Sequence, residues 1–162
     1  MKRENLWAPW RMKYILEKKE GCFLCSVIKE KNKDDKNFLV YRGKYAFIIL
    51  NIYPYNNGHI MIVPIRHLKN IEDLTQEESS EISALTKKSV KILKKVVNPQ
   101  GFNMGMNLGK CSGAGVADHL HLHIVPRWVG DTNFMPIVAG TKVLPQSLSE
   151  LYKVVKKEFN KQ

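Results

Sequence analysis

The chain has 162 residues, of which 44% are hydrophobic and 25% charged, and it carries a formal net charge of +11 at pH 7. These values are typical of a globular protein and exclude a disordered or collagen-like chain, and no apolar run approaches the roughly 20 residues that cross a bilayer. The excess of Lys and Arg favours an anionic partner, but no basic stripe contains an aromatic cluster or a recognised binding motif. Lysines on solvated helix faces explain most of this excess, and a polyphosphate small molecule would also be attracted by it; charge alone does not choose between these interpretations, and a nucleic acid is not expected.

The first part of the chain predicts a helix followed by three strands. Pro9 stands near the start of "WAPWRMKYILEKK", a position that suits proline in the first turn of a short helix. The runs "FLVYR" and "YAFIIL" are separated only by Gly43 and Lys44, which predicts a β-hairpin. A third strand, "HIMIVPIRH", is expected to stop at Pro64.

The second part predicts a long helix, two strands and a last helix. Thr75 and Glu78 have the spacing of a capping box, and the apolar residues that follow repeat with helical period. "GFNMGMNLG" and "DHLHLHIV" alternate in the manner of strands, and a final helix starts near Ser147. The order predicts an α+β fold with a mainly antiparallel sheet, one long central helix and terminal helices.

Nothing in the sequence divides the chain into two domains. We expect a single domain over 1–162, made of an N-terminal helix with a C-x-x-C segment (1–37), a core of sheet, helix and histidines (38–138) and a C-terminal helix (147–160). The N-terminus lacks the apolar run of a signal peptide, and three cysteines, an odd number, fit a reducing compartment. A cytoplasmic protein that does not contact membranes is the expectation.

Three of the five histidines stand two residues apart in "DHLHLHIVPRW". Side chains alternate across a strand, so His119, His121 and His123 should share one face while the leucines between them face a core. Neutral imidazoles can accept protons, attack an electrophile or bind a metal. The alternatives are a polar sheet face without chemistry and a three-histidine zinc site of the hydrolase type.

The loop before the histidines favours phosphate chemistry. "GKCSGAGVAD" contains Gly109, Gly113 and Gly115, which allow backbone N–H groups to turn toward an anion. A second feature, the pair Cys22 and Cys25, forms one C-x-x-C. Such a pair binds a metal only with further ligands, a redox pair would need a βαβ context, and two small buried residues remain the third interpretation.

The sequence resembles the histidine triad (HIT) family of nucleotide hydrolases and transferases. "HLHLHIV" matches the motif of that family, and "LNIYPYNNGHIMIVPIRH" is similar to its nucleoside-binding segment. "WAPWRMKYI", "CFLC" and "HIVPRWVGDTNFMP" resemble the bacterial branch that includes diadenosine tetraphosphate phosphorylases. The resemblance implies a HIT-like fold, a homodimer and a nucleotide or dinucleoside polyphosphate as substrate.

The resemblance also implies roles for individual residues. The catalytic set is His119, His121 and His123; His121 attacks the α-phosphorus to form a nucleotidyl-histidine, and His123 donates to the phosphate oxygens. The implied nucleotide-binding residues are Asn51, Ile52, Asn107, Ser112, Gly113 and Gly115. In part of the family two cysteines and two histidines hold a structural zinc, which implies the ligands Cys22, Cys25, His59 and His119. No organic cofactor is implied.

One position departs from the family pattern. A hydroxyl residue often stands three residues before the first triad histidine, close to the leaving group, and here the residue is Val116. We expect the Ser112 hydroxyl to take the place of that residue, because the loop here is one residue longer than in the family pattern. Arg127, Lys110 and Gly113 to Gly115 are candidates for holding inorganic phosphate as the acceptor in a second step.

The sequence thus predicts cleavage of diadenosine tetraphosphate by phosphorolysis or hydrolysis through a nucleotidyl-histidine. A purine nucleoside phosphoramidase is the alternative within the same family, because the triad does not encode the leaving group. A non-catalytic module that binds nucleotides or nucleic acids is the alternative outside it.

Overall fold

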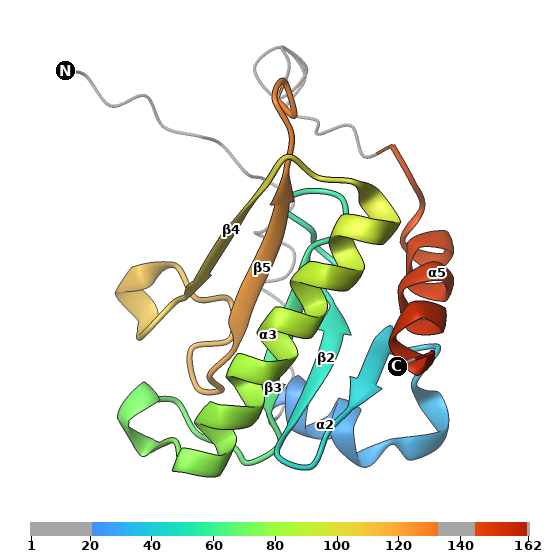
Figure 1. Ribbon diagram of the computed structural model, residues 1–162. Helices are drawn as coiled ribbons and strands as arrows, with labels where there is room; N and C mark the ends of the chain where they lie inside the picture. Colours follow the sequence, from blue (N-terminus) through green and yellow to red (C-terminus); the bar gives the residue numbers. More distant parts are fainter. Residues whose placement is uncertain (1–20, 133–144, 162) are drawn as a thin grey trace, which may run out of the picture.

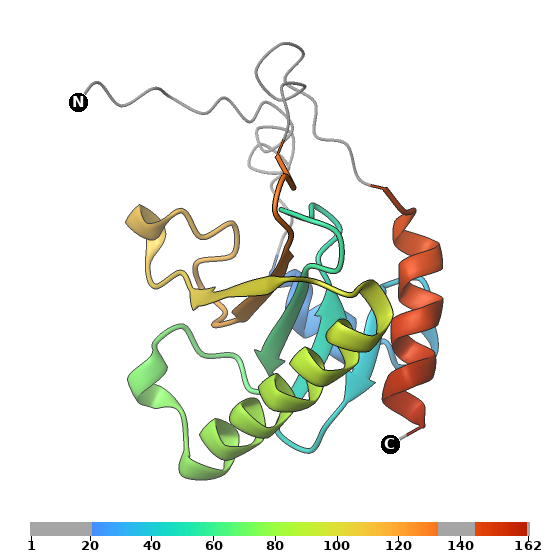
Figure 2. The same ribbon diagram turned by 45° about the horizontal axis from the view of Figure 1, so that its top comes forward.

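A computed structural model describes residues 21–132 and 145–161. Its centre is a five-stranded antiparallel sheet with strand order β1-β2-β3-β5-β4. Helices α3 and α5 pack on one face of the sheet and α2 on the other (Figure 1). Figure 2 shows the same arrangement, with α3 and α5 in front of the strands and α2 behind them. No helix within the described residues is long and apolar enough to cross a membrane.

The elements follow one another in nearly the predicted order. The strands are β1 (Leu39–Arg42), β2 (Ala46–Leu50), β3 (Ile60–Pro64), β4 (Gly101–Met106) and β5 (Leu122–Arg127). The α-helices are α2 (Phe23–Lys29), α3 (Gln76–Val97) and α5 (Leu148–Asn160). Short 3-10 turns occur at η1 (Lys31–Lys33), η2 (Ile71–Asp73) and η3 (Lys110–Ser112).

The predicted α+β fold is confirmed. The β1–β2 hairpin, the end of β3 at Pro64 and the strand β4 all lie where expected. Thr75 and Glu78 form the capping box of α3, and the Ser147 side chain accepts a bond from the Glu150 N–H at the start of α5. The helix expected at "WAPWRMKYILEKK" lies outside the described residues, and the division into three segments stays a prediction.

The sheet separates two hydrophobic layers. Alternate strand residues, among them Ile62 and Ile124, pack under α3 and α5, whereas Met61 and Val63 pack with α2. Because His123 pairs with Met61 across β5 and β3, the two side chains lie on the same face, the α2 face. The chain therefore assigns one face of the sheet to α3 and α5 and leaves the other to α2 and the histidines.

The strand that carries the histidines is shorter than predicted. Regular pairing begins at Leu122, so His119, which is in a bend, and His121 stand before the ladder. The Leu120 N–H donates to the Leu68 carbonyl at 2.7 Å, which ties this segment to the chain that follows β3. All three histidines are buried, which excludes the interpretation of a merely exposed polar face.

Candidate active site

All five histidines of the chain belong to one network. The ring centroids of His121 and His123 are 4.7 Å apart, those of His59 and His123 5.1 Å, and those of His67 and His119 5.0 Å. His119 and His121 are joined through the backbone, since His121 Nδ1 lies 2.8 Å from the His119 carbonyl. Each ring has a different set of neighbours, and these neighbours decide which nitrogen carries the proton.

His59 determines which nitrogen of His123 carries the proton. The Tyr55 N–H donates to His59 Nδ1 at 3.0 Å, and the Asn51 amide nitrogen lies 3.3 Å from the same atom. Nδ1 is therefore an acceptor, and a neutral His59 carries its proton on Nε2. This Nε2 lies 2.9 Å from His123 Nδ1 and donates to it, so neutral His123 is protonated on Nε2 and can donate from that atom.

A glycine makes this geometry attainable. Gly58 has a φ of +78°, and a Cβ at this position would come within 2.9 Å of Pro126. A larger residue would be strained in this backbone conformation and would clash with β5. Gly58 thus lets the turn deliver His59 against the strand that carries His123.

His121 has the opposite tautomer. Its Nδ1–H donates to the His119 carbonyl, which leaves the lone pair on Nε2. Burial lowers the pKa of His121 below the ordinary histidine value, with the carbonyl bond acting in the opposite direction. The ring is consequently neutral near pH 7 and presents one unprotonated nitrogen, which is what a nucleophile needs.

His119 turns its Nδ1 toward the cysteines. Its Nε2–H donates to the Pro64 carbonyl at 2.9 Å, so Nδ1 keeps its lone pair. That atom lies 3.3 Å from Cys22 Sγ and 3.5 Å from Cys25 Sγ. The fourth member is His67, whose Nδ1 lies 3.3 Å from Cys25 Sγ, and the four ligand atoms lie within 4.8 Å of one another.

The predicted metal site is therefore correct in kind and wrong in one ligand. His59 pairs with His123 instead, and His67 takes its place. "IRH" follows Pro64, where β3 ends, and the chain then passes beside Leu120, which brings His67 next to His119. Nothing in the spacing of the histidines along the sequence distinguishes His67 from His59, because this path is a tertiary feature.

The donor set fits zinc. Zinc–ligand bonds of about 2.0–2.3 Å place the ligand atoms of a tetrahedron roughly 3.3–3.8 Å apart, and the sulfur–nitrogen distances match this spacing. The Pro64 carbonyl supplies the outer hydrogen bond that usually fixes the tautomer of a zinc-bound histidine. Two thiolates and two imidazoles would complete the coordination of the ion, so the site is structural in type.

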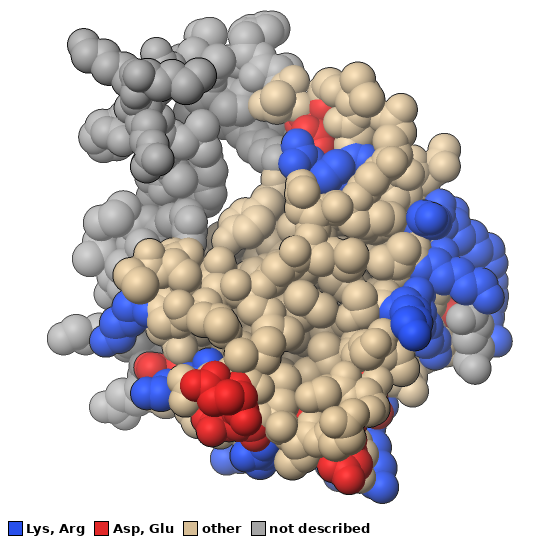
Figure 3. All heavy atoms as spheres, turned by 60° about the vertical axis from the view of Figure 1, so that its left-hand side comes forward, with Lys and Arg blue, Asp and Glu red and all other residues tan. Residues whose placement is uncertain are grey.

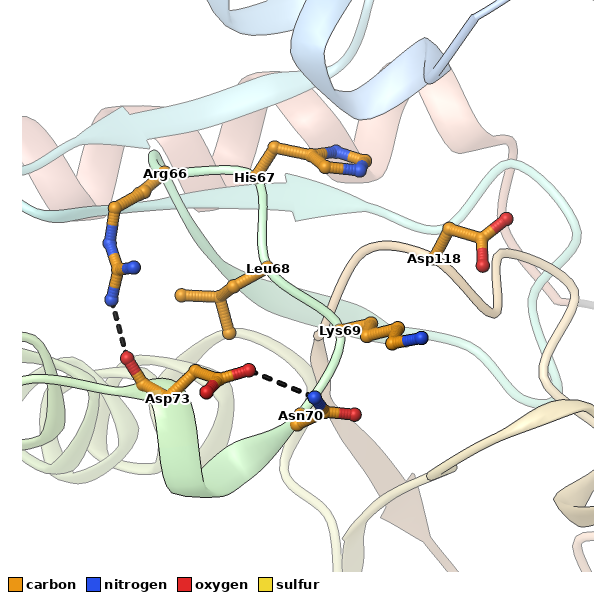
Figure 4. Close-up of a pocket in the computed structure, with 7 residues that line it drawn as sticks. All are labelled: Arg66, His67, Leu68, Lys69, Asn70, Asp73 and Asp118. Carbon is orange, nitrogen blue, oxygen red and sulfur yellow. Dashed lines mark hydrogen bonds between the residues drawn. The ribbon is translucent and has the colours of Figure 1, made fainter.

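A cavity of about 520 Å³ opens beside this cluster (Figure 4). Its lining comes from the segment after β3 and from the residue before the triad: Arg66, His67, Leu68, Lys69, Asn70, Asp73 and Asp118. Figure 4 shows that His67 and Asp118, which both line the cavity, come from these two separate segments. Of the histidines, only His67 lines this cavity, so it gives access to the metal cluster rather than to His121.

The glycine loop follows β4 along the chain. Met106, the last residue of β4, pairs with Leu122, and Asn107 comes directly after it. The binding roles of Asn107 and of the loop glycines stay predictions. The Gly113 N–H donates to the Lys110 carbonyl at 3.3 Å, and Gly109 and Gly113 both have positive φ. The Ser112 hydroxyl donates to the Gly109 carbonyl at 2.7 Å, so its proton stabilises the loop.

One predicted residue, Arg127, is placed differently from expectation. Arg127 stands at the far end of β5, where it binds the Asp131 carboxylate and the Asn103 amide oxygen. The interpretation of Arg127 as a surface ion pair is thus confirmed, and its assignment to a phosphate pocket beside His121 is wrong for this chain. Val116 packs beside the layer under α2, and Cys111 is an exposed free thiol.

The predicted nucleoside-binding segment lies beside His59. Asn51 accepts the Tyr53 N–H at 2.9 Å, the turn-capping contact that its type favours, while its amide nitrogen reaches His59. The Ile52 side chain is 47% exposed next to this turn and is therefore available to a ligand. Contact of Asn51 and Ile52 with a nucleoside stays a prediction.

Comparisons with known proteins place this geometry in context. The HIT domain model matches residues 32–129. An AP-4-A phosphorylase of Mycobacterium tuberculosis is 41% identical over 98% of this chain and 86% of that protein. A histidine triad nucleotide-binding protein of Sulfolobus tokodaii aligns with a TM-score of 0.66 at 28% identity, covering 86% of this chain and 90% of that one. A zinc-bound histidine triad protein of Mycobacterium smegmatis shares the fold, with a TM-score of 0.67 at 20% identity over 87% of this chain and 94% of that one.

We expect protein purified without chelator or nickel resin to contain about one zinc per chain. His67→Ala removes one of four ligands and should lower the zinc content to well under half, as measured by plasma emission spectrometry. His59→Ala, the matched control, removes a buried histidine that is not in the cluster and should retain the metal. Zinc loss in the His59 variant and retention in the His67 variant would contradict the ligand set.

Proposed function

The chain belongs to the HIT domain family, and we propose that it cleaves diadenosine tetraphosphate by phosphorolysis, with His121 as the nucleophile. The observation that carries the proposal is the division of labour between two neighbouring imidazoles. His121 keeps a lone pair on Nε2, whereas His123 carries a proton on Nε2. One ring is prepared to attack phosphorus and the next to donate to the oxygens on it.

The first step forms a bond between His121 Nε2 and the α-phosphorus of one adenylate. The bond from that phosphorus to the bridging oxygen breaks, and ATP leaves. As the ring becomes bonded at Nε2, it acquires positive charge, which the His119 carbonyl stabilises through the Nδ1–H bond. The same bond holds the ring in the line of attack, so no reorientation is needed when the charge develops.

Donors around the phosphate stabilise the transition state. His123 Nε2–H is the first of these, and we propose Asn107, the residue that follows β4, as the second. The backbone of the loop from Ser112 to Gly115 adds N–H groups with the flexibility that glycine provides. Of these groups, His123 Nε2–H is fixed by His59 before substrate arrives and would favour charge on the phosphate oxygens.

The leaving group distinguishes the proposal from a phosphoramidase. An amine that leaves from a P–N bond must gain a proton, whereas ATP leaves as a stable polyphosphate anion and needs none. Val116 supplies no hydroxyl at the usual position, and Ser112 donates its proton to Gly109. A site without a prepared proton donor suits a polyphosphate leaving group better than an amine.

In the second step inorganic phosphate attacks the adenylyl-histidine and releases ADP. The 41% identity to an AP-4-A phosphorylase over nearly the whole chain supports phosphate, rather than water, as the acceptor. Lys110, exposed on the loop, and the N–H groups near Gly113 remain the candidates for binding this phosphate. Arg127 is not a candidate for binding this phosphate, because its guanidinium is paired with Asp131.

The metal cluster helps to position the nucleophile without contacting the substrate. Zinc, when bound, would cross-link α2, the segment after β3 and the triad. Its ligand His119 is also the residue whose carbonyl orients His121. Cys22, Cys25 and His67 therefore position the nucleophile through His119 rather than by touching substrate.

The proposal includes a homodimer in the cytoplasm. β4 is an edge strand, and Met104 on it is 54% exposed. Within residues 21–132 and 145–161 no strand pairs with the outer side of β4, and an apolar edge of this kind is a site where a second copy can extend the sheet with two-fold symmetry. The cysteines Cys22, Cys25 and Cys111 are free, which agrees with a reducing compartment.

Product analysis tests the reaction. With diadenosine tetraphosphate and millimolar phosphate, the enzyme should yield ATP and ADP in equal amounts, as separated by ion-exchange chromatography. Without phosphate, slow attack by water should yield ATP and AMP. AMP as the main product at saturating phosphate would show a hydrolase instead.

The same assay tests the nucleophile. His121→Asn preserves a polar side chain but removes the attacking nitrogen, and kcat should fall at least about 1000-fold while the nucleotide still binds. An adenosine phosphoramidate serves as the comparison substrate, and faster turnover of it than of diadenosine tetraphosphate would favour the phosphoramidase. A variant that keeps a tenth of the wild-type rate would remove His121 from the mechanism.

The dimer is tested by light scattering after size exclusion. Met104→Lys places a charge on the β4 edge and should convert the dimer to a monomer. Val154→Lys adds the same charge at an apolar residue that is 43% exposed on α5, and it should leave the dimer intact. A wild-type chain that is monomeric at micromolar concentration would contradict the proposal.

A further inference from the structure

The lysines of α3 and α5 gather on the face of the molecule away from the triad. They are Lys87, Lys88, Lys91, Lys94 and Lys95 on α3, and Lys153, Lys156, Lys157 and Lys161 on or just after α5. The two helices pack together, and Lys95 binds Glu158, which joins the two groups. Figure 3 shows Lys and Arg atoms concentrated on the side of the molecule where these helices lie, with little red among them.

This basic face is on the opposite side of the sheet from the chemistry. α3 and α5 cover the layer that contains Ile62 and Ile124, whereas His123 lies with Met61 on the α2 face. A substrate held at His121 therefore cannot contact these lysines. Substrate binding therefore does not explain why these lysines contribute so much of the +11 net charge.

The charge pattern differs from that of an ordinary solvated helix face. From Lys87 to Val97, α3 has no acidic residue, and Lys87, Lys91 and Lys95 repeat at four-residue intervals. Each pair of like charges at this spacing destabilises a helix by about 0.2–0.5 kcal/mol. Solubility alone is better served by charges of both signs, which would remove this cost.

Few acidic groups neutralise the basic face. Glu158 binds Lys95 and Lys161, and these two lysines lower the pKa of its carboxyl to about 2, so it stays ionised. Asp35 binds Lys156. Within residues 21–132 and 145–161, no carboxylate pairs with Lys91, Lys94 or Lys157, and all three are exposed.

We propose that the basic face of α3 and α5 binds the phosphate backbone of a nucleic-acid duplex without reading its sequence. Lysine contacts phosphate as a point charge, and contacts of this kind hold a duplex in place without discriminating between bases. Single strands are usually bound by aromatic side chains that stack on bases, and this face presents none in an exposed position. A duplex, whose bases are already stacked, needs only the phosphate contacts.

An anionic membrane is the less suitable partner. Helices that lie on a membrane insert an apolar face between the lipid headgroups. The apolar residues of α3 and α5, such as Ile92, Leu151 and Val155, are buried against the sheet. Val154 is the large apolar side chain that remains exposed on these two helices, which is too little to anchor them.

The sequence alone favours no nucleic-acid partner, because each lysine run looks like one solvated helix. The structure adds that the two runs share a surface and that this surface is separate from the active site. The proposal does not depend on phosphorolysis. It concerns a different face of the molecule and a different ligand.

The test measures the fluorescence anisotropy of a short labelled DNA duplex of random sequence, from about 50 to 200 mM KCl. The full chain should bind with an affinity that falls steeply with salt, by a log–log slope of about −0.9 for each phosphate contacted. The triple variant Lys91→Gln, Lys94→Gln, Lys157→Gln should weaken binding at least tenfold and make the slope less steep by nearly three, at about 0.9 for each lost contact. Its thermal unfolding midpoint, followed by circular dichroism, should match that of the wild type, which shows that it is folded whatever reaction the active site performs.

The matched control is Lys29→Gln, Lys31→Gln, Lys44→Gln, which removes the same charge from exposed lysines outside the face. The proposal requires that this control bind the duplex within about threefold of wild type, a small change compared with several lost contacts. Equal losses in both triple variants would mean a general charge effect and would overturn it. Tighter binding to the single strand, or to phosphatidylglycerol vesicles with no duplex binding, would overturn it as well.

Discussion

The whole site depends on backbone groups that fix the proton of each imidazole. The Tyr55 N–H fixes the proton of His59 on Nε2, and His59 in turn fixes the proton of His123 on Nε2. The Pro64 carbonyl fixes the proton of His119 on Nε2, and the His119 carbonyl fixes the proton of His121 on Nδ1. In the proposed mechanism, identical side chains thus become a metal ligand, a nucleophile and a donor. Side chains of one type can differ in function only where their surroundings differ, and here the surroundings are rigid parts of the fold.

The fold provides this rigidity by dividing the sheet between two uses. Under α3 and α5 it buries alternate apolar residues, and the other face holds α2, the metal cluster and the triad. His119 links these parts, since its ring belongs to the cluster and its carbonyl orients His121. Catalytic geometry is therefore coupled to the packing of α2 through the thiols that α2 presents. The opposite face is free to carry the lysines of α3 and α5.

Much of the fold could be predicted from local patterns, because each pattern has a local cause. The capping box of Thr75 and Glu78, the stop at Pro64 and the strand from Leu122 onward depend on near neighbours only. The exchange of His59 for His67 could not be predicted, since the two residues stand at opposite ends of β3 and only the path of the chain after β3 brings His67 to the cysteines. Arg127 was misplaced for a similar reason, because Asp131 binds it through a turn whose geometry the sequence does not specify. The shared surface of two lysine-rich helices is likewise a tertiary feature.

The measurement that tests this account most directly is the ¹⁵N NMR spectrum of the histidine side chains in the zinc-loaded protein near pH 7. Two-bond correlations identify the protonated nitrogen of each ring, and single substitutions assign the signals. The account predicts a proton on Nδ1 of His121 and on Nε2 of both His59 and His123, with no exchange between the tautomers. A proton on Nε2 of His121, or a mixture of tautomers at His123, would contradict the assignment of nucleophile and donor from which the proposed mechanism follows.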